Sequence, residues 1–204
     1  MDAAKLFDNW AKGGRAEGME QGHLQTAGPV LFQLNIEPMG TFLDLGCGNG
    51  WASEWAARAG ANVIAIDASQ EMVERAQKRI PTARVHRGDF ATLPVEDNTV
   101  QIVWSMEAIY YAQGPDEVLK EIARVLAPGG QVHILIDYYE ENQASHSWPE
   151  SVGVAMTLRS ESEWQRALEK VGLITTTSRL RGVGELWKQE QGTLYLHGIS
   201  PKLS

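Results

Sequence analysis

Residues 43–50 read Leu43-Asp44-Leu45-Gly46-Cys47-Gly48-Asn49-Gly50, an apolar run that breaks into an acid and three alternate glycines. This pattern predicts a strand that turns onto a nucleotide-like ligand. Glycine in such a turn permits positive φ angles and lets a ligand approach the N–H groups of the turn and of the following helix. A pyrophosphate ligand is disfavoured, because the Asp44 carboxylate repels phosphate and Trp51 stands where the dinucleotide fingerprint requires its third glycine.

Two further strand ends follow at the distances that a βαβ unit requires. The apolar, β-branched run 62–66 ends in Asp67, and a short strand over 84–87 leads into Gly88-Asp89-Phe90. Between them, Ser69 is placed to cap a helix whose apolar residues recur at helical spacing up to residue 80. A carboxylate at the carboxyl end of the second strand is suited to accept hydrogen bonds from ribose hydroxyls.

The rest of the chain continues the alternation of strands and helices. A central strand over 100–104 ends in Ser105-Met106-Glu107, at the edge where ligands of open parallel sheets collect. Gly114-Pro115 opens a helix, Pro128-Gly129-Gly130 turns the chain, and residues 131–136 are expected to form the fifth strand. Two final strands are predicted over 173–180 and 193–199.

The D-x-G-x-G-x-G spacing from Asp44 to Gly50 resembles motif I of the class I S-adenosylmethionine-dependent methyltransferases, whose ligand carries an ammonium group and no phosphate. The order of features over about residues 40–137 is similar to that of the small-molecule subgroup that includes the ubiquinone and menaquinone biosynthesis enzymes. The resemblance implies an α/β fold, a doubly wound, seven-stranded, mostly parallel sheet with an antiparallel C-terminal strand pair (the Rossmann-like methyltransferase fold). It also implies S-adenosyl-L-methionine as the cofactor.

The resemblance assigns the cofactor contacts to the ends of the first four strands. In the family, the Gly-Asp-aromatic turn places its acid near the adenine amino group, with an apolar side chain bordering the ring. The residues expected at the cofactor from these strand ends are Asp44, Gly46, Cys47, Gly48, Gly50, Asp67, Ala68, Met72, Gly88, Asp89, Phe90 and Ser105.

Residues 1–36 are predicted to form an N-terminal helical cap or lid, with Gly13-Gly14 as a hinge between two helices. As part of a lid, Trp10 would close over the sulfonium by cation–π attraction, and Arg15 would pair with a carboxylate of the cofactor or of the substrate. The alternative is that Phe7 and Trp10 pack the helix on the sheet and that Arg15 is solvated.

Residues 137–160 are predicted to form an insertion on the substrate side of the sheet. Two polar-aromatic clusters leave adjacent strand ends in this region, so we expect a substrate pocket there. The residues expected to bind the substrate are Tyr110, Tyr111, Tyr138 and Tyr139. The alternative for each of them is a small satellite core under a long loop.

Three residues are candidates for a general base, which is needed only if the acceptor atom carries a proton. They are Glu107, His146 and Asp137 in that order, because Glu107 is closest in sequence to the strand end that meets the methionine moiety. Positioning and desolvation can supply most of the barrier reduction without a nucleophilic residue, since a sulfonium already activates the methyl group.

The composition is typical of one soluble domain over residues 1–204, with 43% hydrophobic and 22% charged residues. No apolar run approaches the length of a membrane span, and the N-terminus lacks the apolar core of a signal peptide. The single cysteine, Cys47, cannot form an intramolecular disulfide, which fits a reducing compartment. We therefore expect a cytoplasmic protein that does not bind membranes.

The charge of the chain limits its partners. The formal charge is −8 and the basic residues are scattered, which disfavours nucleic-acid binding by the chain alone. The fourth strand is not followed by the Asn/Asp-Pro-Pro-aromatic turn that is usual in enzymes that methylate base amines or glutamine amides. The five histidines show no metal-ligating spacing, so no metal is predicted.

We therefore expect a methyltransferase that moves a methyl group by in-line displacement to an O, N, S or C atom of a small-molecule acceptor, as a monomer or homodimer. Two alternatives stay open. One is a methyltransferase for tRNA, rRNA or a translation factor that needs a small zinc-binding activator protein. The other is a non-catalytic S-adenosylmethionine-binding protein. An NAD or nucleotide-sugar enzyme is disfavoured by the missing third glycine.

Overall fold

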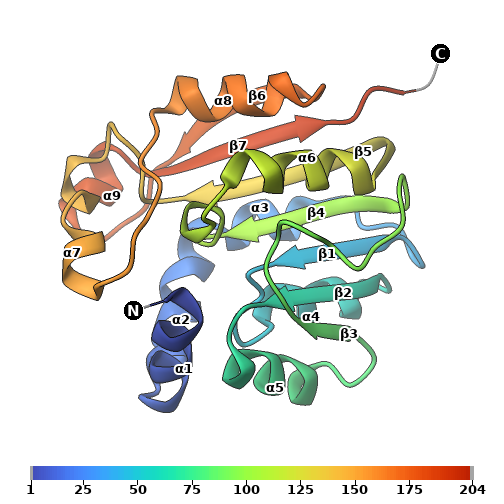
Figure 1. Cartoon of the computed structure of the whole chain (residues 1–204), viewed down its shortest axis with the longest axis horizontal. Coiled ribbons are helices and arrows are strands. Elements are labelled where there is room, and N and C mark those ends of the chain that lie inside the picture. The colour runs from blue at the N-terminus through green and yellow to red at the C-terminus, as the bar shows by residue number, and fades with distance from the viewer. Residues whose placement is uncertain (1, 203–204) are drawn as a thin grey trace.

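A seven-stranded sheet forms the centre of residues 2–202, the part of the chain that the computed structural model describes (Figure 1). The strand order is β3-β2-β1-β4-β5-β7-β6. The strands are β1 (Thr41–Leu45), β2 (Asn62–Asp67), β3 (Arg84–Arg87), β4 (Val100–Met106), β5 (Leu126–Ile136), β6 (Ile174–Leu180) and β7 (Thr193–Ile199). β1 to β5 are parallel, and β7 is antiparallel to both β5 and β6. The predicted fold class is confirmed.

Helices cover both faces of this sheet and its carboxyl edge. They are α1 (Ala3–Lys12), α2 (Arg15–Thr26), α3 (Gly28–Gln33), α4 (Trp51–Arg58), α5 (Gln70–Arg79), α6 (Pro115–Val125), α7 (Trp148–Val152), α8 (Glu161–Lys170) and α9 (Leu186–Glu190). Short 3-10 turns lie at η1 (Ile109–Tyr111) and η2 (Gln143–Ser145). Within residues 2–202, none of these helices is long and apolar enough to cross a bilayer.

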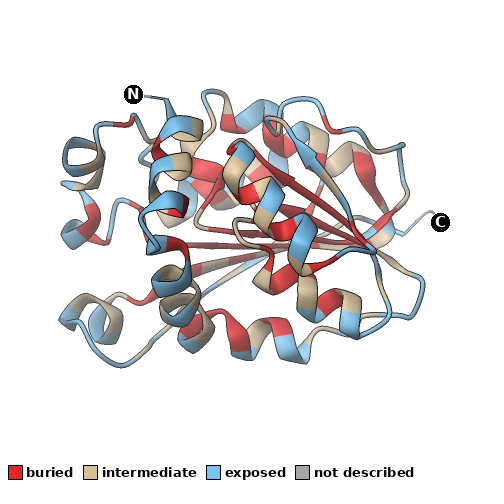
Figure 2. Cartoon of the chain, turned by 90° about the horizontal axis from the view of Figure 1, so that it is seen from below, coloured by how far each residue is buried: buried red, intermediate tan, exposed pale blue. Residues whose placement is uncertain are grey.

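The strands of the sheet centre are buried on both faces, as in other parallel sheets (Figure 2). In β1, Phe42 belongs to the buried cluster that includes residues of α3, α4 and α5, whereas Leu43 and Leu45 belong to the cluster on the other face, which includes residues of α6 and α8. This alternation follows from the two-residue period of a strand. The strands β1, β2 and β4, whose ends are expected to meet the cofactor, are therefore buried between two layers of helices.

The fifth strand starts earlier than the sequence predicts. It begins at Leu126 instead of Gln131, and it absorbs Pro128-Gly129-Gly130 with a shift of register opposite Val100. A Cβ on Gly130 would lie only 2.7 Å from the carbonyl oxygen of Val100. The glycine therefore permits a close approach of the β4 and β5 backbones. The residues expected to form a turn before the strand instead form an irregular part of the strand itself.

The carboxyl ends of β1, β2 and β4 point toward two groups of helices. α1 and α2 lie on one side, near α5, and α7 and α9 lie on the other side, past β5 and β7 (Figure 1). These two groups come from the ranges 1–36 and 137–190, so both variable parts of the chain meet at the edge where the site is expected.

Polar contacts hold α1 and α2 on the sheet's own helices. Arg79 of α5 donates to both carboxylate oxygens of Glu20 in α2 at 2.8 and 2.9 Å, and to Glu54 of α4 at 2.6 Å. Asp8 of α1 accepts a hydrogen bond from the hydroxyl of Ser69, the N-cap of α5, at 2.6 Å. The N-terminal helices are thus docked mainly through α5.

We predict that Arg79→Gln loosens the N-terminal helices without unfolding the sheet. Loss of the bidentate pair is expected to lower the free energy of unfolding by about 1–2 kcal/mol and to raise amide hydrogen exchange in residues 15–26 more than in β1 and β4. Arg124→Gln is the matched control, because Arg124 makes an equally short ion pair with Glu121 elsewhere. Equal exchange of residues 15–26 in both variants would contradict the prediction.

Candidate functional site

Main-chain hydrogen bonds tie the glycine turn after β1 to the end of β2. The N–H groups of Gly46 and Cys47 donate to the carbonyl of Ile66 at 2.8 and 3.1 Å. The N–H of Gly48 donates to a carboxylate oxygen of Asp67 at 2.9 Å. The strand end that is expected to meet a ribose is therefore fixed directly against the glycine turn.

Each of the three glycines of the turn occupies its position for a different structural reason. A Cβ on Gly46 would lie 2.2 Å from the Cβ of Ala108, so only glycine permits this approach to the loop after β4. Gly48 has φ +53° and nothing within 4 Å of its Cβ position, so it borders open space. Gly50 has φ +83° and would meet Ala76 at 3.1 Å, because it brings α4 against α5.

Two buried acids border this turn. Asp44 is 2% exposed and accepts a hydrogen bond from the hydroxyl of Ser53 at 2.6 Å. Burial raises the pKa of Asp44 to about 7, and the charge of Asp67 adds to the shift. Burial also raises the pKa of Asp67 to about 6, although the N–H groups of Ser69 and Gly48 oppose it. Both carboxyls are thus poised to ionise fully when a cation or new hydrogen-bond donors arrive.

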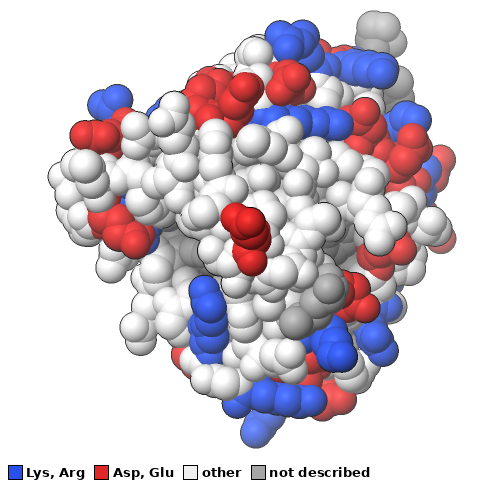
Figure 3. All heavy atoms as spheres, turned by 60° about the vertical axis from the view of Figure 1, so that its left-hand side comes forward, with Lys and Arg blue, Asp and Glu red and all other residues white. Residues whose placement is uncertain are grey.

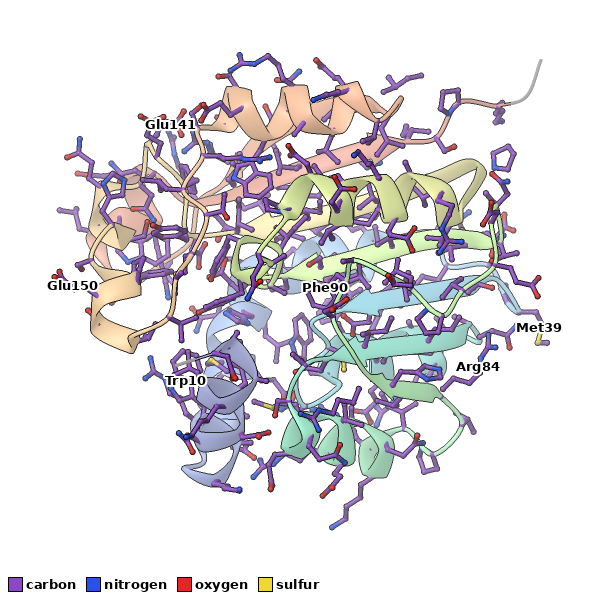
Figure 4. The ribbon with its side chains drawn as sticks, viewed as in Figure 1. Trp10, Met39, Arg84, Phe90, Glu141 and Glu150 are labelled. Atoms are coloured by element: carbon purple, nitrogen blue, oxygen red, sulfur yellow. The ribbon has the colours of Figure 1, made fainter. Side chains whose placement is uncertain are left out.

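A cavity of about 1050 Å³ lies at the carboxyl edge of the sheet, between the two groups of helices. Most of the residues expected at the cofactor line it: Trp10, Arg15, Asp44, Gly46, Cys47, Gly48, Asp67, Ala68, Met72, Gly88, Asp89 and Phe90. Figure 4 shows Trp10 on this side of the molecule and Phe90 near its middle, whereas Met39 and Arg84 lie at the opposite edge of the sheet. The structure thus brings residues from five separate segments to one cavity.

Two of the expected cofactor residues do not line the cavity. Gly50 is used in the packing of α4 on α5. Ser105 is buried inside the sheet, where its hydroxyl donates to the carbonyl of Leu45 at 3.0 Å. Gly50 is taken up by the packing of two helices, and the strand period directs the Ser105 side chain into the sheet.

The cavity extends beyond the glycine turn to the residues after β4 and β5. Glu107, Tyr110, Tyr111 and Asp137 line this part, which we call the acceptor end. Burial, together with the charge of Asp137, raises the pKa of Glu107 well above its usual range. Burial raises the pKa of Asp137 to about 6. The four residues come from two adjacent strand ends, as the sequence predicts.

Three other residues expected in this part of the site do not line the cavity. The hydroxyl of Tyr139 donates to the carbonyl of Gly192 at 2.8 Å, so this side chain is part of the core. Tyr138 supports the wall from behind, with its ring centroid 5.4 Å from that of Tyr110. His146 is exposed, and its ring nitrogen lies 2.9 Å from the carbonyl oxygen of Glu140. The position of His146 outside the cavity does not support a role as a general base.

Several cavity residues were not among the predicted site residues. His23 of α2 lines the cavity, and burial together with the charge of Lys188 lowers its pKa to about 4. Trp148, Met156, Trp187 and Lys188 line it from the α7 and α9 segments. The two tryptophans were visible as aromatic residues in variable loops, but no pattern in the sequence places α9 beside α7.

The N-terminal helices contribute a stacked pair of side chains. The guanidinium carbon of Arg15 lies 4.0 Å from the ring centroid of Trp10, and both residues line the cavity. Phe7 makes edge contacts with Trp10 at 5.3 Å and with Tyr111 at 5.1 Å. Trp10 therefore packs against its neighbours and also borders the cavity, so the two alternatives drawn from the sequence are compatible.

The face formed by this edge carries few charges near its centre, where one acidic and one basic side chain stand among uncharged residues (Figure 3). Most of the Lys, Arg, Asp and Glu side chains on it lie toward its margins. An extended basic surface for a nucleic-acid backbone is not seen on this face, which agrees with the acidic charge of the chain.

These features define a class of protein, an α/β enzyme that holds a nucleotide-like cofactor at the carboxyl edge of an open parallel sheet. The residues fit S-adenosylmethionine in particular. The space beside Gly48 admits close main-chain contact, the Asp44 carboxylate lines the cavity, and Asp67 ends β2 at the same cavity. An acid at this turn suits an ammonium group and opposes a phosphate.

The family model described as a methyltransferase domain matches residues 43–134. A Haloferax volcanii chain described as a putative methyltransferase, solved in complex with the Trm112 methyltransferase activator, is 34% identical with a TM-score of 0.91, and the match covers 98% of this chain and 99% of that one. A Thermotoga maritima methyltransferase is 20% identical with a TM-score of 0.72 over 96% of this chain and 98% of that one. The chain belongs to the class I S-adenosylmethionine-dependent methyltransferases.

Curated relatives agree with this family. The malonyl-[acyl-carrier protein] O-methyltransferase of Pseudescherichia vulneris is 31% identical over 158 residues, which are 78% of this chain and 61% of the relative. The chain spans between 32% and 61% of the length of the first curated relatives that it matches. The predicted family, enzyme class and S-adenosylmethionine cofactor are thereby confirmed, and the non-catalytic alternative is not supported.

We predict that two glycine substitutions in the turn have different consequences, one mainly for stability and the other mainly for cofactor binding. Gly50→Ala should lower the free energy of unfolding by about 2–4 kcal/mol, because its Cβ meets α5 at a positive φ. Gly48→Ala should cost only about 1–2 kcal/mol but weaken cofactor binding at least about tenfold, since its Cβ enters the cavity. Urea denaturation and calorimetric titration with S-adenosylhomocysteine measure the two effects. Equal losses of stability and affinity in both variants would refute the distinction.

We predict that Asp44→Asn stabilises the free protein at alkaline pH. The folded-state pKa of about 7 lies above the ordinary value of 3.8, so ionisation of Asp44 destabilises the fold as the pH rises from about 4 to 7. The amide keeps an acceptor for Ser53, and at pH 8 it should raise the free energy of unfolding by roughly 2–4 kcal/mol. At pH 4 the gain should vanish. A thermal denaturation series over this pH range tests the sign, and a gain that is independent of pH would contradict it.

Proposed function

We propose that this enzyme transfers the methyl group of S-adenosylmethionine to a small molecule held at the acceptor end of the cavity. The observation that carries the proposal is that the cavity continues past the glycine turn and is walled by the same chain. Val154 and Met156, after α7, and Trp187 of α9 form that wall. A small acceptor would be largely surrounded by protein there, as small ligands usually are.

The cofactor part of the cavity is the region lined by Trp10, Arg15 and residues of the segments 44–48, 67–72 and 88–90. Each group there has a specific task in this proposal. The Asp44 carboxylate accepts from the cofactor ammonium group, and Asp67 accepts from the ribose hydroxyls. Arg15, already stacked on Trp10, is placed to pair with a carboxylate, and Phe90 borders the adenine ring. When bound, the cofactor supplies a methyl group that its sulfonium already activates. The chain then has to align the acceptor and to exclude water.

The ranges 1–36 and 137–160 have the roles of a cofactor lid and an acceptor-side insertion in this proposal. Support comes from the cavity itself, because α1 and α2 border the cofactor part and α7 borders the acceptor end. The docking of α2 through Glu20 also bears on the turn, since that carboxylate accepts from the Asn49 amide at 2.6 Å. Movement of the lid would therefore disturb the residue between Gly48 and Gly50.

We predict that Asp67→Ala weakens S-adenosylmethionine binding at least about a hundredfold, because both the ribose acceptor and the bond that shapes the Gly48 turn are lost. Calorimetric titration of the wild type and the variant with S-adenosylmethionine, S-adenosylhomocysteine and NADH tests it. Asp89→Ala is the control for an exposed cavity acid, and it should lose less affinity. Unchanged S-adenosylmethionine binding in Asp67→Ala, or binding of NADH alone, would overturn the assignment of the cofactor part.

A second candidate is the same chemistry on tRNA, rRNA or a translation factor, with a small activator protein bound. The specific observation in its favour is the 34% identity with the Haloferax volcanii chain, which was solved with the Trm112 activator. Co-expression with a Trm112 protein distinguishes the two candidates. Co-purification with a clear rise in solubility and cofactor affinity supports the second. Methylation of small acceptors by the isolated chain supports the first.

A further inference from the structure

Glu107, which is half-buried, and Asp137, which is buried, form an acid pair at the acceptor end. One carboxylate oxygen of Glu107 accepts a short hydrogen bond from the main-chain N–H of Asp137, and the other accepts from the hydroxyl of Tyr110 at 2.6 Å. Oδ1 of Asp137 accepts from the hydroxyl of Thr193 at 2.6 Å. Both acids border the cavity, and Oδ2 of Asp137 has no hydrogen bond to another described residue.

The backbone at Glu107 is itself unusual. Its φ is +53°, a conformation that residues other than glycine rarely adopt. This geometry turns the side chain toward the end of β5, where it meets Asp137. Strain of this kind is found mainly where a site requires it, and the packing of the strand end on Leu135 holds it in place through a main-chain bond of 2.9 Å.

Within residues 2–202, no cation forms an ion pair with either acid of the pair. The groups that face the pair are Tyr110 and Tyr111 of η1, Thr193 of β7, and Glu185 and Lys188 of the α9 segment. Lys188 is the one cation among these described groups, and its ammonium lies 3.6 Å from the carboxylate of Glu185. The negative charge of the pair is therefore stabilised mainly by neutral hydrogen-bond donors.

We propose that the Glu107–Asp137 pair recognises a protonated amine of the acceptor and takes up the proton that its nitrogen must lose. The inference rests on the proposed function and specifies its substrate class. A carboxyl pair that lies largely below the surface attracts a cation strongly, because little water can screen the charge, and it repels an anionic acceptor. A hydroxyl or thiol acceptor would gain only a neutral hydrogen bond.

The surrounding walls fit the same class of ligand. The ring of Trp148 meets that of Trp187 at 6.1 Å between centroids, and the rings of Tyr110 and Tyr111 are 4.7 Å apart. Aromatic faces attract organic cations and cover apolar ligand bodies. The acceptor that fits is thus an amine on an apolar or aromatic body, with the amine directed to the pair.

In the proposed step, the acid pair accepts the proton that the acceptor nitrogen loses. The ammonium nitrogen gives one proton to a carboxylate of the pair and regains its lone pair. That lone pair forms the N–C bond to the methyl carbon as the C–S bond breaks and its electrons return to sulfur. The product is a methylated ammonium and a neutral thioether, and the pair holds the released proton until solvent removes it.

The experiment is calorimetric titration of the protein saturated with S-adenosylhomocysteine, using three probes of one shape. The probes are 2-phenylethylamine, 2-phenylethanol and phenylacetate. We expect the amine to bind at least about tenfold more tightly than the alcohol, and phenylacetate to bind most weakly. Glu107→Gln and Asp137→Asn should each remove most of the amine preference while binding of the alcohol stays unchanged, since each substitution keeps the shape of the side chain and one acceptor oxygen.

Lys188→Met provides the matched control of opposite sign. It removes the cation that faces the pair, so it should strengthen amine binding several-fold and leave binding of the alcohol unchanged. Glu161→Gln, which removes an acid distant from the cavity, should change none of the three affinities. These two variants keep the test decisive if a substitution at Glu107 fails to fold.

Equal binding of amine and alcohol, tighter binding of phenylacetate, or an amine preference that survives both acid substitutions would overturn the inference. So would the failure of all three probes to bind the loaded protein. Titration with S-adenosylhomocysteine alone separates this result from a failure of the proposed function. If the cofactor product itself does not bind, the methyltransferase site is wrong, and if it binds while the amine preference is missing, only the substrate class is wrong.

Discussion

The hydrogen bond from the Gly48 N–H to the Asp67 carboxylate is the contact on which the site depends. β1 and β2 are paired in parallel with Leu45 opposite Ile66, so both strands end at the same level. The turn after one strand can then be held by the carboxylate that ends the other. Because the same turn starts α4, a displacement of Asp67 would shift the helix, the cavity floor and the cofactor contacts together.

The same edge concentrates buried negative charge. Asp44, Asp67 and Asp137 are buried at the ends of strands, and Glu107 is half-buried after β4. Removal from solvent is the largest cause of the raised pKa of each. Stability alone would favour apolar residues at these positions. Ligands that bring an ammonium group and hydroxyl donors relieve this destabilisation, so part of their binding free energy comes from the protein's own strain. A site of this kind is less stable when empty and selects its ligands by charge.

The sequence predicted the fold and most of the cofactor part because those features are local. Strand periods, the glycine turn and the acid at the end of β2 each lie within a few residues, and the parallel topology brings their ends together. Gly50 and Ser105 could not be placed, since helix packing and strand orientation direct them away from the cavity. His23 and Lys188 meet across 165 positions of sequence, and no local pattern encodes such a contact.

The acceptor end differs from the cofactor part in how it is held together. α7 and α9 are each five residues long, too short to be stable as isolated helices. Contacts of Trp148 with Trp187 and Tyr138 therefore have to hold them against the sheet. The cofactor part, in contrast, is built on β1, β2 and the main chain of the turn. Opening of α7 and α9 to admit an acceptor would leave the Gly48–Asp67 contact intact, so the two halves of the site can bind their ligands in separate steps.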